Sequence, residues 1–283
     1  MSNIVLTSVN AGYSHPNFGL RYILANMGEL ESSTRIVEGT RRGGREPMIR
    51  EIVSHAPAII GISVAVWNHQ DSRELAAALR DLLPDSVIVM GGPEAGYLAG
   101  DGPGYASHPL FEHADLVVRG EGEILFPELC RKILSEIDKA GRPGQTSLRR
   151  RAKELIPETR RFQQLSPRQL EKIRLPYHLL SDHDIVHRRL YIETSRGCPF
   201  RCEFCLSSVQ GAVRNIPLEG IFPPSGAIGR RGDAFSSLLT VHSTWIFPGR
   251  RRCWTCFWSY SVMNGGMTLT SSLRWCRTGC LMS

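Results

Sequence analysis

Three cysteines lie within eight positions of the stretch RGCPFRCEFC, residues 196–205, and their spacing is Cys198-x3-Cys202-x2-Cys205. Structural zinc sites use four ligands, commonly as two cysteine pairs, so three thiolates on one short loop leave a fourth position to be filled from elsewhere. A [4Fe–4S] cluster held by three thiolates keeps one iron open to an outside ligand. The spacing therefore favours an iron–sulfur cluster, with a half zinc site or a chance grouping of cysteines as the alternatives.

The residues around these cysteines carry a family resemblance. Phe204 precedes the last cysteine, the strand-like segment LYIET (190–194) precedes the first, and the wider stretch reads YIETSRGCPFRCEFCLSS. With the cysteine spacing, this stretch resembles the radical SAM signature, in the branch that carries an N-terminal cobalamin-binding domain and is related to the anaerobic magnesium-protoporphyrin ester cyclases. The segment NAGYSHPNFGLRYI and the loops MGGPE and RGEGE resemble the same branch, so that the resemblance covers about residues 1–222.

The resemblance implies a set of cofactors and partners. Cys198, Cys202 and Cys205 would bind a [4Fe–4S] cluster, and Phe204 would lie near the adenine of S-adenosylmethionine. The open iron would bind the amino and carboxylate groups of S-adenosylmethionine and cleave it reductively to methionine and a 5′-deoxyadenosyl radical. Cobalamin is the second expected cofactor. The expected reaction is methyl transfer to an unactivated carbon, or radical cyclisation or rearrangement, on a small-molecule substrate with an electron donor such as flavodoxin or ferredoxin.

The elements that must position these residues follow from the hydrophobic pattern. Apolar runs predict strands and amphipathic runs predict helices, in the alternating order strand 4–9, helix 19–30, strand 57–67, helix 71–83, strands 86–92 and 114–123, and helix 124–137. This alternation indicates an α/β fold with a doubly wound parallel sheet. We therefore expect a cobalamin-binding-like Rossmann domain over residues 1–140. The resemblance adds the truncated start of a radical SAM partial TIM barrel, with its cluster loop, over residues 188–222.

Ligands of such sheets bind at the loops beyond the carboxyl ends of the strands. Here those loops are NAGYSHPNFG, WNHQD, GGPEAGY and RGEGE, and their glycines permit close backbone approach or a positive φ. The expected cofactor-binding residues are Asn10, His15, Gly91, Gly92, Glu94, Gly120 and Glu121, with Glu123 as a further carboxylate. The alternative is ordinary turn chemistry for the glycines and helix capping for the carboxylates.

His15 is the histidine to weigh as a cobalt ligand. Some cobalamin domains supply a lower axial histidine from an Asp-x-His-x-x-Gly motif. The stretch Tyr-Ser-His-Pro-Asn-Phe-Gly that contains His15 lacks the aspartate and has one residue too many before Gly19. We therefore expect cobalamin to bind without a protein histidine on cobalt.

The net charge of +7 is concentrated at the carboxyl-terminal end of the chain. Residues 1–222 hold 27 Lys and Arg against 26 Asp and Glu, whereas residues 223–283 hold seven Arg and a single acidic residue, Asp233. The balanced body does not predict nucleic-acid binding. Residues 141–187 are polar, basic and interrupted by prolines, as in a linker. The start of the chain has no secretory signal and no segment is apolar enough to span a bilayer, so we expect a cytoplasmic protein without a membrane partner.

The last 61 residues, 223–283, have no sustained helical or strand period and hold four of the eight cysteines and four of the five tryptophans. The pairs Cys253-x2-Cys256 and Cys276-x3-Cys280, together with the arginines, resemble zinc knuckles. A zinc- and nucleic-acid-binding protein is therefore the alternative function.

A reading-frame error near residue 222 is a second explanation of this tail. Met and Trp each have a single codon, and both codons end in G. In a frame that joins the third base of each codon to the first two bases of the next, the codon that begins within Met or Trp therefore starts with G, which determines some residues whatever the codon usage. Met263–Asn264 gives Glu, and Trp245–Ile246, Trp254–Thr255 and Met267–Thr268 each give Asp. Acidic residues thus return to a segment that has almost none. The hypothesis predicts that the tail as written is disordered and that the barrel continues in another frame.

Overall fold

The structure is a computed structural model, and it describes residues 3–100, 108–140, 149–152, 162–188, 191–193, 195–198, 203, 211–216, 240–245, 254–263 and 266–273. The chain divides into two compact units. Unit 1 contains residues 1–165 and 173–179, and unit 2 contains residues 166–172 and 180–283. Unit 1 thus extends beyond the boundary expected at residue 140.

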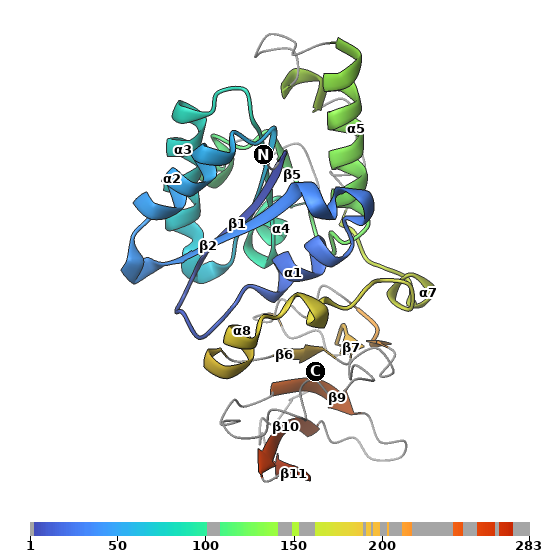
Figure 1. Ribbon diagram of the computed structural model, residues 1–283. Coiled ribbons are helices and arrows are strands. Elements are labelled where there is room, and N and C mark those ends of the chain that lie inside the picture. The colour runs from blue at the N-terminus through green and yellow to red at the C-terminus, as the bar shows by residue number, and fades with distance from the viewer. Residues whose placement is uncertain are drawn as a thin grey trace. The chain divides into compact units, whose positions relative to one another are not determined.

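Unit 1 is built on a five-stranded parallel sheet, shown in Figure 1. Its strands are β1 (Ile4–Asn10), β2 (Thr34–Thr40), β3 (Ile59–Ser63), β4 (Val87–Gly91) and β5 (Leu116–Val117). They lie in the order β2-β1-β3-β4-β5, so the connections wind to opposite sides of β1. The doubly wound parallel sheet predicted from the sequence is confirmed.

Helices cover both faces of this sheet (Figure 1). One face packs against α2 (Glu46–His55), α3 (His69–Leu82), α4 (Pro93–Leu98) and the short helix η5 (Pro109–Phe111). The other face packs against α1 (Phe18–Ala25) and α5 (Leu125–Ala140). Every residue of β1 is buried, as a central strand between two helical layers requires. Short helices η1 (Gly28–Ser33), η2 (Arg41–Gly43) and η3 (Val66–Asn68) complete the connections.

Among the elements of unit 1 that were not predicted from the sequence are the strand β2 and the helix α2. β2 carries the charged residues Arg35 and Glu38 among its apolar ones, because it is an edge strand with one row of backbone groups outside the sheet. α2 has only two buried side chains, Met48 and Ile52, which lie one turn apart. Their i, i+4 spacing after Pro47 was the available helix signal.

Three predicted elements are shorter than expected. The helix predicted over 19–30 ends at Ala25, where Asn26 caps it and Gly28 takes a φ of +61°. The strand predicted over 57–67 ends at Ser63. The strand predicted over 114–123 keeps only its two paired residues, because the backbone turns at Gly120 with a φ of +78°.

Part of the expected linker is packed into unit 1. Residues 162–165 lie alongside the chain after β5, with Gly120 and Gln163 paired as in a parallel sheet. The short helix η7 (Pro176–Leu179) packs on α1, and the ring centroids of Phe18 and Tyr177 are 6.0 Å apart.

Unit 2 contains α7 (Pro167–Leu170) and α8 (Asp182–His187), and its strands are β6 (Tyr191–Glu193), β7 (Ser195–Arg196), β8 (Arg214–Asn215), β9 (Thr240–Trp245), β10 (Trp254–Met263) and β11 (Gly266–Leu273). β6 pairs in parallel with β9. β9 pairs antiparallel with β10, and β10 pairs antiparallel with β11. A radical SAM barrel is not present among the described residues. The strands β9 to β11 differ from the disorder expected for the tail, and their many Thr, Val and aromatic residues favour β-structure. The reading-frame hypothesis concerns the DNA and stays a prediction.

None of the helices in the described part of the chain is both long and apolar enough to cross a membrane.

Candidate functional site

The carboxyl edge of the sheet in unit 1 is the place where the loops that follow all five strands meet. The order β2-β1-β3-β4-β5 places a topological switch point between β1 and β3. At such a point the flanking connections leave in opposite directions, and the crevice between them is the general ligand position of open α/β sheets. The polar residues Asn10, Thr40 and Ser63 end β1, β2 and β3 at this edge.

Asn68 joins the loop after β3 to the ends of β1 and β3. Its Nδ2 donates to the carbonyl oxygens of Val9 (3.0 Å) and Ser63 (3.2 Å) and lies 3.3 Å from Oγ of Ser8. Its Oδ1 accepts from the backbone N–H of Ala65 at 2.7 Å. Asn68 is only 1% exposed, and these contacts use its donors and its acceptor. Asn68 thus fixes the position of the loop that precedes α3.

Glu38, on β2, organises the loop after β1. Its Oε1 accepts from Nδ2 of Asn10 (2.8 Å) and from the backbone N–H of Asn17 (2.6 Å), and its Oε2 pairs with Arg21 at 2.8 Å. The side chains of Glu38 and Arg21 are about nine-tenths buried, so charge-assisted hydrogen bonds are needed to offset their desolvation. Asn10 thus has a structural partner at the position where the sequence predicted a cofactor contact.

Asn17 and His15 belong to the same loop. Oδ1 of Asn17 caps α1 by accepting from Leu20 N–H at 3.0 Å, and its Nδ2 donates to Oγ of Ser63 at 3.0 Å. His15 is partly buried, and its backbone N–H donates to the carbonyl of Gly12 at 3.2 Å in a turn. The structure places His15 on the carboxyl edge, as predicted, and its role toward cobalt stays a prediction.

Gly91 and Gly92 let the chain after β4 approach β3. The N–H of Val64 donates to the carbonyl of Gly91 at 2.7 Å. Gly92 has a φ of +97°, and a Cβ there would come within 2.6 Å of the carbonyl oxygen of Val64. Only glycine fits such a position. These glycines thus have a packing function between strands, and a further contact with a cofactor stays a prediction.

Glu94 pairs with a histidine at this edge. Its Oε1 is 3.2 Å from Nδ1 of His69, the first residue of α3, and the ring of His69 meets that of His108 edge-on at 5.6 Å. A carboxylate on Nδ1 orients an imidazole. The dyad connects the start of α3 to the start of α4, and the sequence analysis found only its Glu94 member.

Gly120 and Glu121 hold the segment 162–165. A Cβ at Gly120 would overlap the carbonyl oxygen of Gln163, and the buried carboxylate of Glu121 accepts from the N–H of Leu165 at 2.6 Å. The predicted carboxylate Glu123 is also buried. The structure therefore gives Glu121 a backbone partner, and its predicted contact with a cofactor is left without support from the described geometry.

Exposed apolar side chains gather at the same edge. Among the described residues, six large apolar side chains are exposed, and five of them follow a strand end directly or in the next short helix: Tyr13, Val66, Trp67, Tyr97 and Ile124. We call these five residues the apolar rim. The sixth, Leu82, is the last residue of α3. Single exposed apolar residues are common, so it is the grouping of five after the ends of four parallel strands that makes this edge a candidate binding surface. The sequence analysis did not single out these residues.

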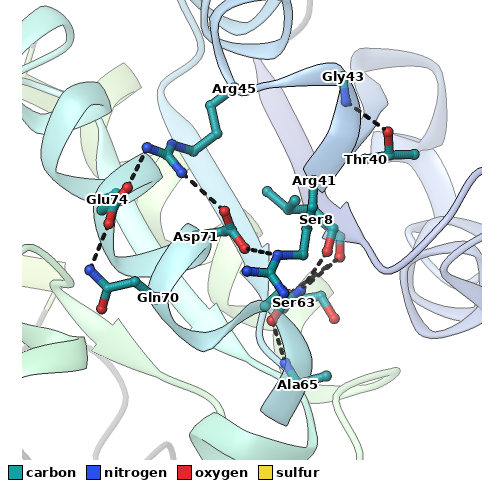
Figure 2. Close-up of polar contacts among 12 residues, drawn as sticks. Ser8, Thr40, Arg41, Gly43, Arg45, Ser63, Ala65, Gln70, Asp71 and Glu74 are labelled. Carbon is teal, nitrogen blue, oxygen red and sulfur yellow. Dashed lines mark hydrogen bonds and ion pairs between the residues drawn. The ribbon is translucent and has the colours of Figure 1, made fainter.

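An ion-pair network joins residues after β2 to the first turns of α3, as Figure 2 shows. Asp71 lies between Arg41 of η2, at 2.9 Å, and Arg45, at 3.0 Å, and Arg45 also contacts Glu74. Oγ1 of Thr40 accepts from the N–H of Gly43 at 3.2 Å and so caps η2. These contacts tie the loop after β2 to α3, and Asp71 also suits the first turn of α3, where the helix dipole favours a negative charge.

The predicted cluster ligands fall only partly within the described residues. Cys198 is partly buried and lies two residues after the end of β7, whereas Cys202, Cys205 and Phe204 lie outside the described residues. Within the described part of the chain, no group of three or more His, Cys, Asp or Glu side chains is arranged to hold a metal ion. The ligand set therefore stays a prediction.

The fold defines unit 1 as a doubly wound α/β domain, and the edge at its switch point is the candidate ligand site. Residues 4–130 match the sequence model of the B12 binding domain family. That range begins at the first residue of β1 and ends within α5, so it contains the whole five-stranded sheet.

Relatives of known class extend the comparison. The chain is 31% identical over 157 residues to the cobalamin-dependent radical SAM methyltransferase TokK of Streptomyces tokunonensis, covering 53% of this chain and 22% of that protein. It is 28% identical over 217 residues to an uncharacterized methyltransferase of Pyrococcus horikoshii (72% and 43%), and 28% identical over 189 residues to the hopanoid C-3 methylase of Methylococcus capsulatus (60% and 34%). The chain thus spans less than half the length of these curated relatives.

A solved structure shares the fold. The radical S-adenosylmethionine methyltransferase TsrM of Kitasatospora setae, solved with cobalamin and a [4Fe–4S] cluster bound, superposes with a TM-score of 0.51 at 18% identity. The match covers 82% of this chain and 48% of that one.

Proposed function

We propose that unit 1 binds cobalamin at the carboxyl edge of its sheet and that the chain is part of a cobalamin-dependent radical SAM methyltransferase. The proposed cobalamin site rests on the apolar rim. The rim residues follow the strand ends at the edge that contains the switch point, and all of them lie within residues 4–130, which match the B12 binding domain. A corrin ring is broad and largely apolar, so it can cover side chains that water otherwise solvates.

The contacts beneath the rim support such a ligand, because they hold the rim loops in place. Val66 and Trp67 project from a loop that Asn68 fixes, and Gly92 keeps the neighbouring chain close to β3. The rim would contact the macrocycle, while the Glu38 and Asn68 contacts would keep its loops in place. When bound, cobalamin would supply a carrier for a methyl group.

The test of the cobalamin site compares exposed apolar residues at the two ends of α3. Trp67→Ala removes a rim side chain that is 54% exposed, in η3 just before α3, whereas Leu82→Ala removes one that is 55% exposed at the far end of α3. Titration with hydroxocobalamin, followed by absorbance, should give a Kd about tenfold weaker for W67A. The L82A variant should bind like the wild type. Equal binding by all three proteins would refute the rim as the site.

The proposed second half rests on the cysteine spacing and on the relatives. Cys198, Cys202 and Cys205 would hold a [4Fe–4S] cluster, which would supply the electron that cleaves S-adenosylmethionine. Methyl transfer is favoured over cyclisation or rearrangement because the relatives are named methyltransferases or a methylase. The substrate would be a small molecule, and the electron donor a protein of the flavodoxin or ferredoxin class.

The reading frame after residue 222 decides how much of that enzyme this chain contains. We propose a frameshift there, because forced acidic residues in the alternative frame replace a basic tail. Sequencing the coding DNA from the codon for Phe222 past the stop tests it directly, and an intact frame would refute it.

Zinc binding by the late cysteines is the second candidate function. Metal analysis separates the two: about four irons with acid-labile sulfide per chain support the cluster, and zinc without sulfide supports the alternative. Replacing Cys202 by Ala should abolish the iron, whereas replacing Cys253 by Ala should leave it unchanged.

A further inference from the structure

The segment that carries the three cysteines begins and ends at one short ladder. β7 and β8 pair antiparallel, with Ser195 opposite Asn215 and Arg196 opposite Arg214. Residues 197–213 lie between these strands, so the two ends of the cysteine-bearing segment are held next to each other. Closing a loop costs conformational entropy, and a paired ladder at its base supplies hydrogen bonds against that cost.

Arg196, the last residue of β7, forms a forked ion pair with Glu193, the last residue of β6. Its Nε is 3.1 Å from Oε1 and its Nη2 is 3.0 Å from Oε2. The side chain of Arg196 is only 7% exposed. Two parallel charge-assisted hydrogen bonds fix the orientation of both groups, and the burial of Arg196 limits screening by water on its side of the pair. The end of β7 is therefore fixed relative to the end of β6.

Gly197 follows directly and touches the other end of the segment. Its φ is +89°, and a Cβ there would overlap the carbonyl oxygen of Ala212 and lie 3.1 Å from that of Gly211. Any side chain would push the two backbones apart. Cys198 is the next residue, so its position depends on this close approach.

We propose that the Glu193–Arg196 pair and the contact of Gly197 with Ala212 are positioning elements for the metal cluster: they hold the backbone that leads into Cys198, its first expected ligand, in place. This inference rests on the proposed cluster. A cluster needs its ligands placed before they coordinate, and residues outside the ligand set commonly supply that placement. Neither Arg196 nor Gly197 is itself a ligand.

The two glycines at the ends of the segment provide a matched test. Gly197→Ala introduces both an unfavourable φ and a backbone overlap, whereas Gly211→Ala introduces only the φ, because at +65° no atom lies within 4 Å of the added Cβ. After anaerobic reconstitution of the full chain, iron and acid-labile sulfide are measured per chain. We expect G197A to hold at least fivefold less of both than the wild type, and G211A to stay within a factor of two.

Two substitutions of Arg196 test the ion pair: one removes the charge, and the other keeps the charge but changes the shape of the donor group. Arg196→Gln removes the charge, and Arg196→Lys keeps it but cannot engage both carboxylate oxygens in the same fork. R196Q should lose at least fivefold in bound iron, and R196K should fall between R196Q and the wild type. The EPR signal of the reduced cluster in R196K should also change its response to S-adenosylmethionine, which a general loss of stability would not cause.

The controls separate this inference from the proposed function and from misfolding. A wild-type chain that binds no iron refutes the proposed cluster. A wild-type chain with four irons, beside G197A and R196Q variants that also hold four, overturns the positioning role. Every variant should bind hydroxocobalamin like the wild type, since that site lies in unit 1. If G197A loses both cofactors, the iron content and EPR signal of R196K decide the question.

Discussion

Nδ2 of Asn68 donates to the carbonyl oxygen of Val9 across 3.0 Å and so ties the loop after β3 to the end of β1. Asn68 directly follows Val66 and Trp67 in the sequence. Its contact with Val9 spans the switch point between β1 and β3. The shape of the proposed cobalamin site therefore depends on a buried amide that does not itself face solvent.

Asn68→Asp should weaken that site. The change replaces a donor with a second carboxylate oxygen, which then faces the carbonyl oxygens of Val9 and Ser63. We expect the Kd for hydroxocobalamin to rise at least tenfold and the free energy of unfolding to fall by about 2 kcal/mol. Gln70→Glu adds the same charge on the exposed surface of α3 and should change the Kd less than twofold. Similar Kd values for both variants would contradict the role of Asn68.

The bound cobalamin should have no protein histidine on cobalt. His15 lacks the surrounding motif, and Nδ1 of His69 faces Glu94. In the reduced cob(II)alamin state, a nitrogen ligand splits the EPR lines according to its isotope. Protein labelled with ¹⁵N-histidine should therefore give the same spectrum as unlabelled protein. A change in the splitting would show a histidine ligand, and His15→Ala and His69→Ala would then identify it.

Asp115 should be a major determinant of the stability of unit 1. Its fully buried carboxylate pairs with Arg80 at 2.6 Å and Arg149 at 2.7 Å and accepts from the N–H of Ile88 at 2.9 Å. Burial lowers the pKa of Arg80, and the charge of Asp115 opposes that shift. Asp115→Ala leaves buried charge without its partner, so urea unfolding should show a loss of about 3 kcal/mol.

An exposed ion pair provides the control for this experiment. Glu112 and Arg73 are 3.4 Å apart, with side chains 58% and 40% exposed. Glu112→Gln should cost less than about 0.5 kcal/mol, because exposed pairs are screened by water. Equal losses for D115A and E112Q would contradict the importance of burial at Asp115.

Cys130 should stay unreactive in the folded protein. It is fully buried in α5, and burial raises the pKa of its thiol because the thiolate would lose its hydration. At pH 8 the group is therefore protonated, and iodoacetamide should modify Cys198 at least tenfold faster in the metal-free chain. Mass spectrometry of the alkylated peptides measures both rates. Rapid labelling of Cys130 without denaturant would contradict the buried position of α5.

The sequence predicted the parallel sheet well because buried central strands leave long apolar runs, as in IVLTSV and PAIIGIS. It missed β2, whose edge position permits charged residues such as Arg35. It could not limit β5 to Leu116–Val117, because the turn at Gly120 is imposed by Gln163, more than forty residues away.

The candidate site was predictable in place but not in its contacts. Loops after successive parallel strands meet at one edge, so the position followed from the strand pattern alone. The hydrogen-bond partners could not be predicted from the strand pattern. Glu38 meets Asn10, and Leu165 meets Glu121, only because the tertiary fold brings them together. Trp67 was visible in the loop WNHQD, but its exposure depends on η3, which apolar periodicity does not reveal.

Equilibrium dialysis of the full chain against hydroxocobalamin tests the central claim most directly. The proposed site predicts one cobalamin per chain at saturation, with W67A weakened and L82A unaffected under the same conditions. A chain that is folded by circular dichroism and retains no cobalamin at a hundredfold excess of ligand would contradict the assignment of unit 1.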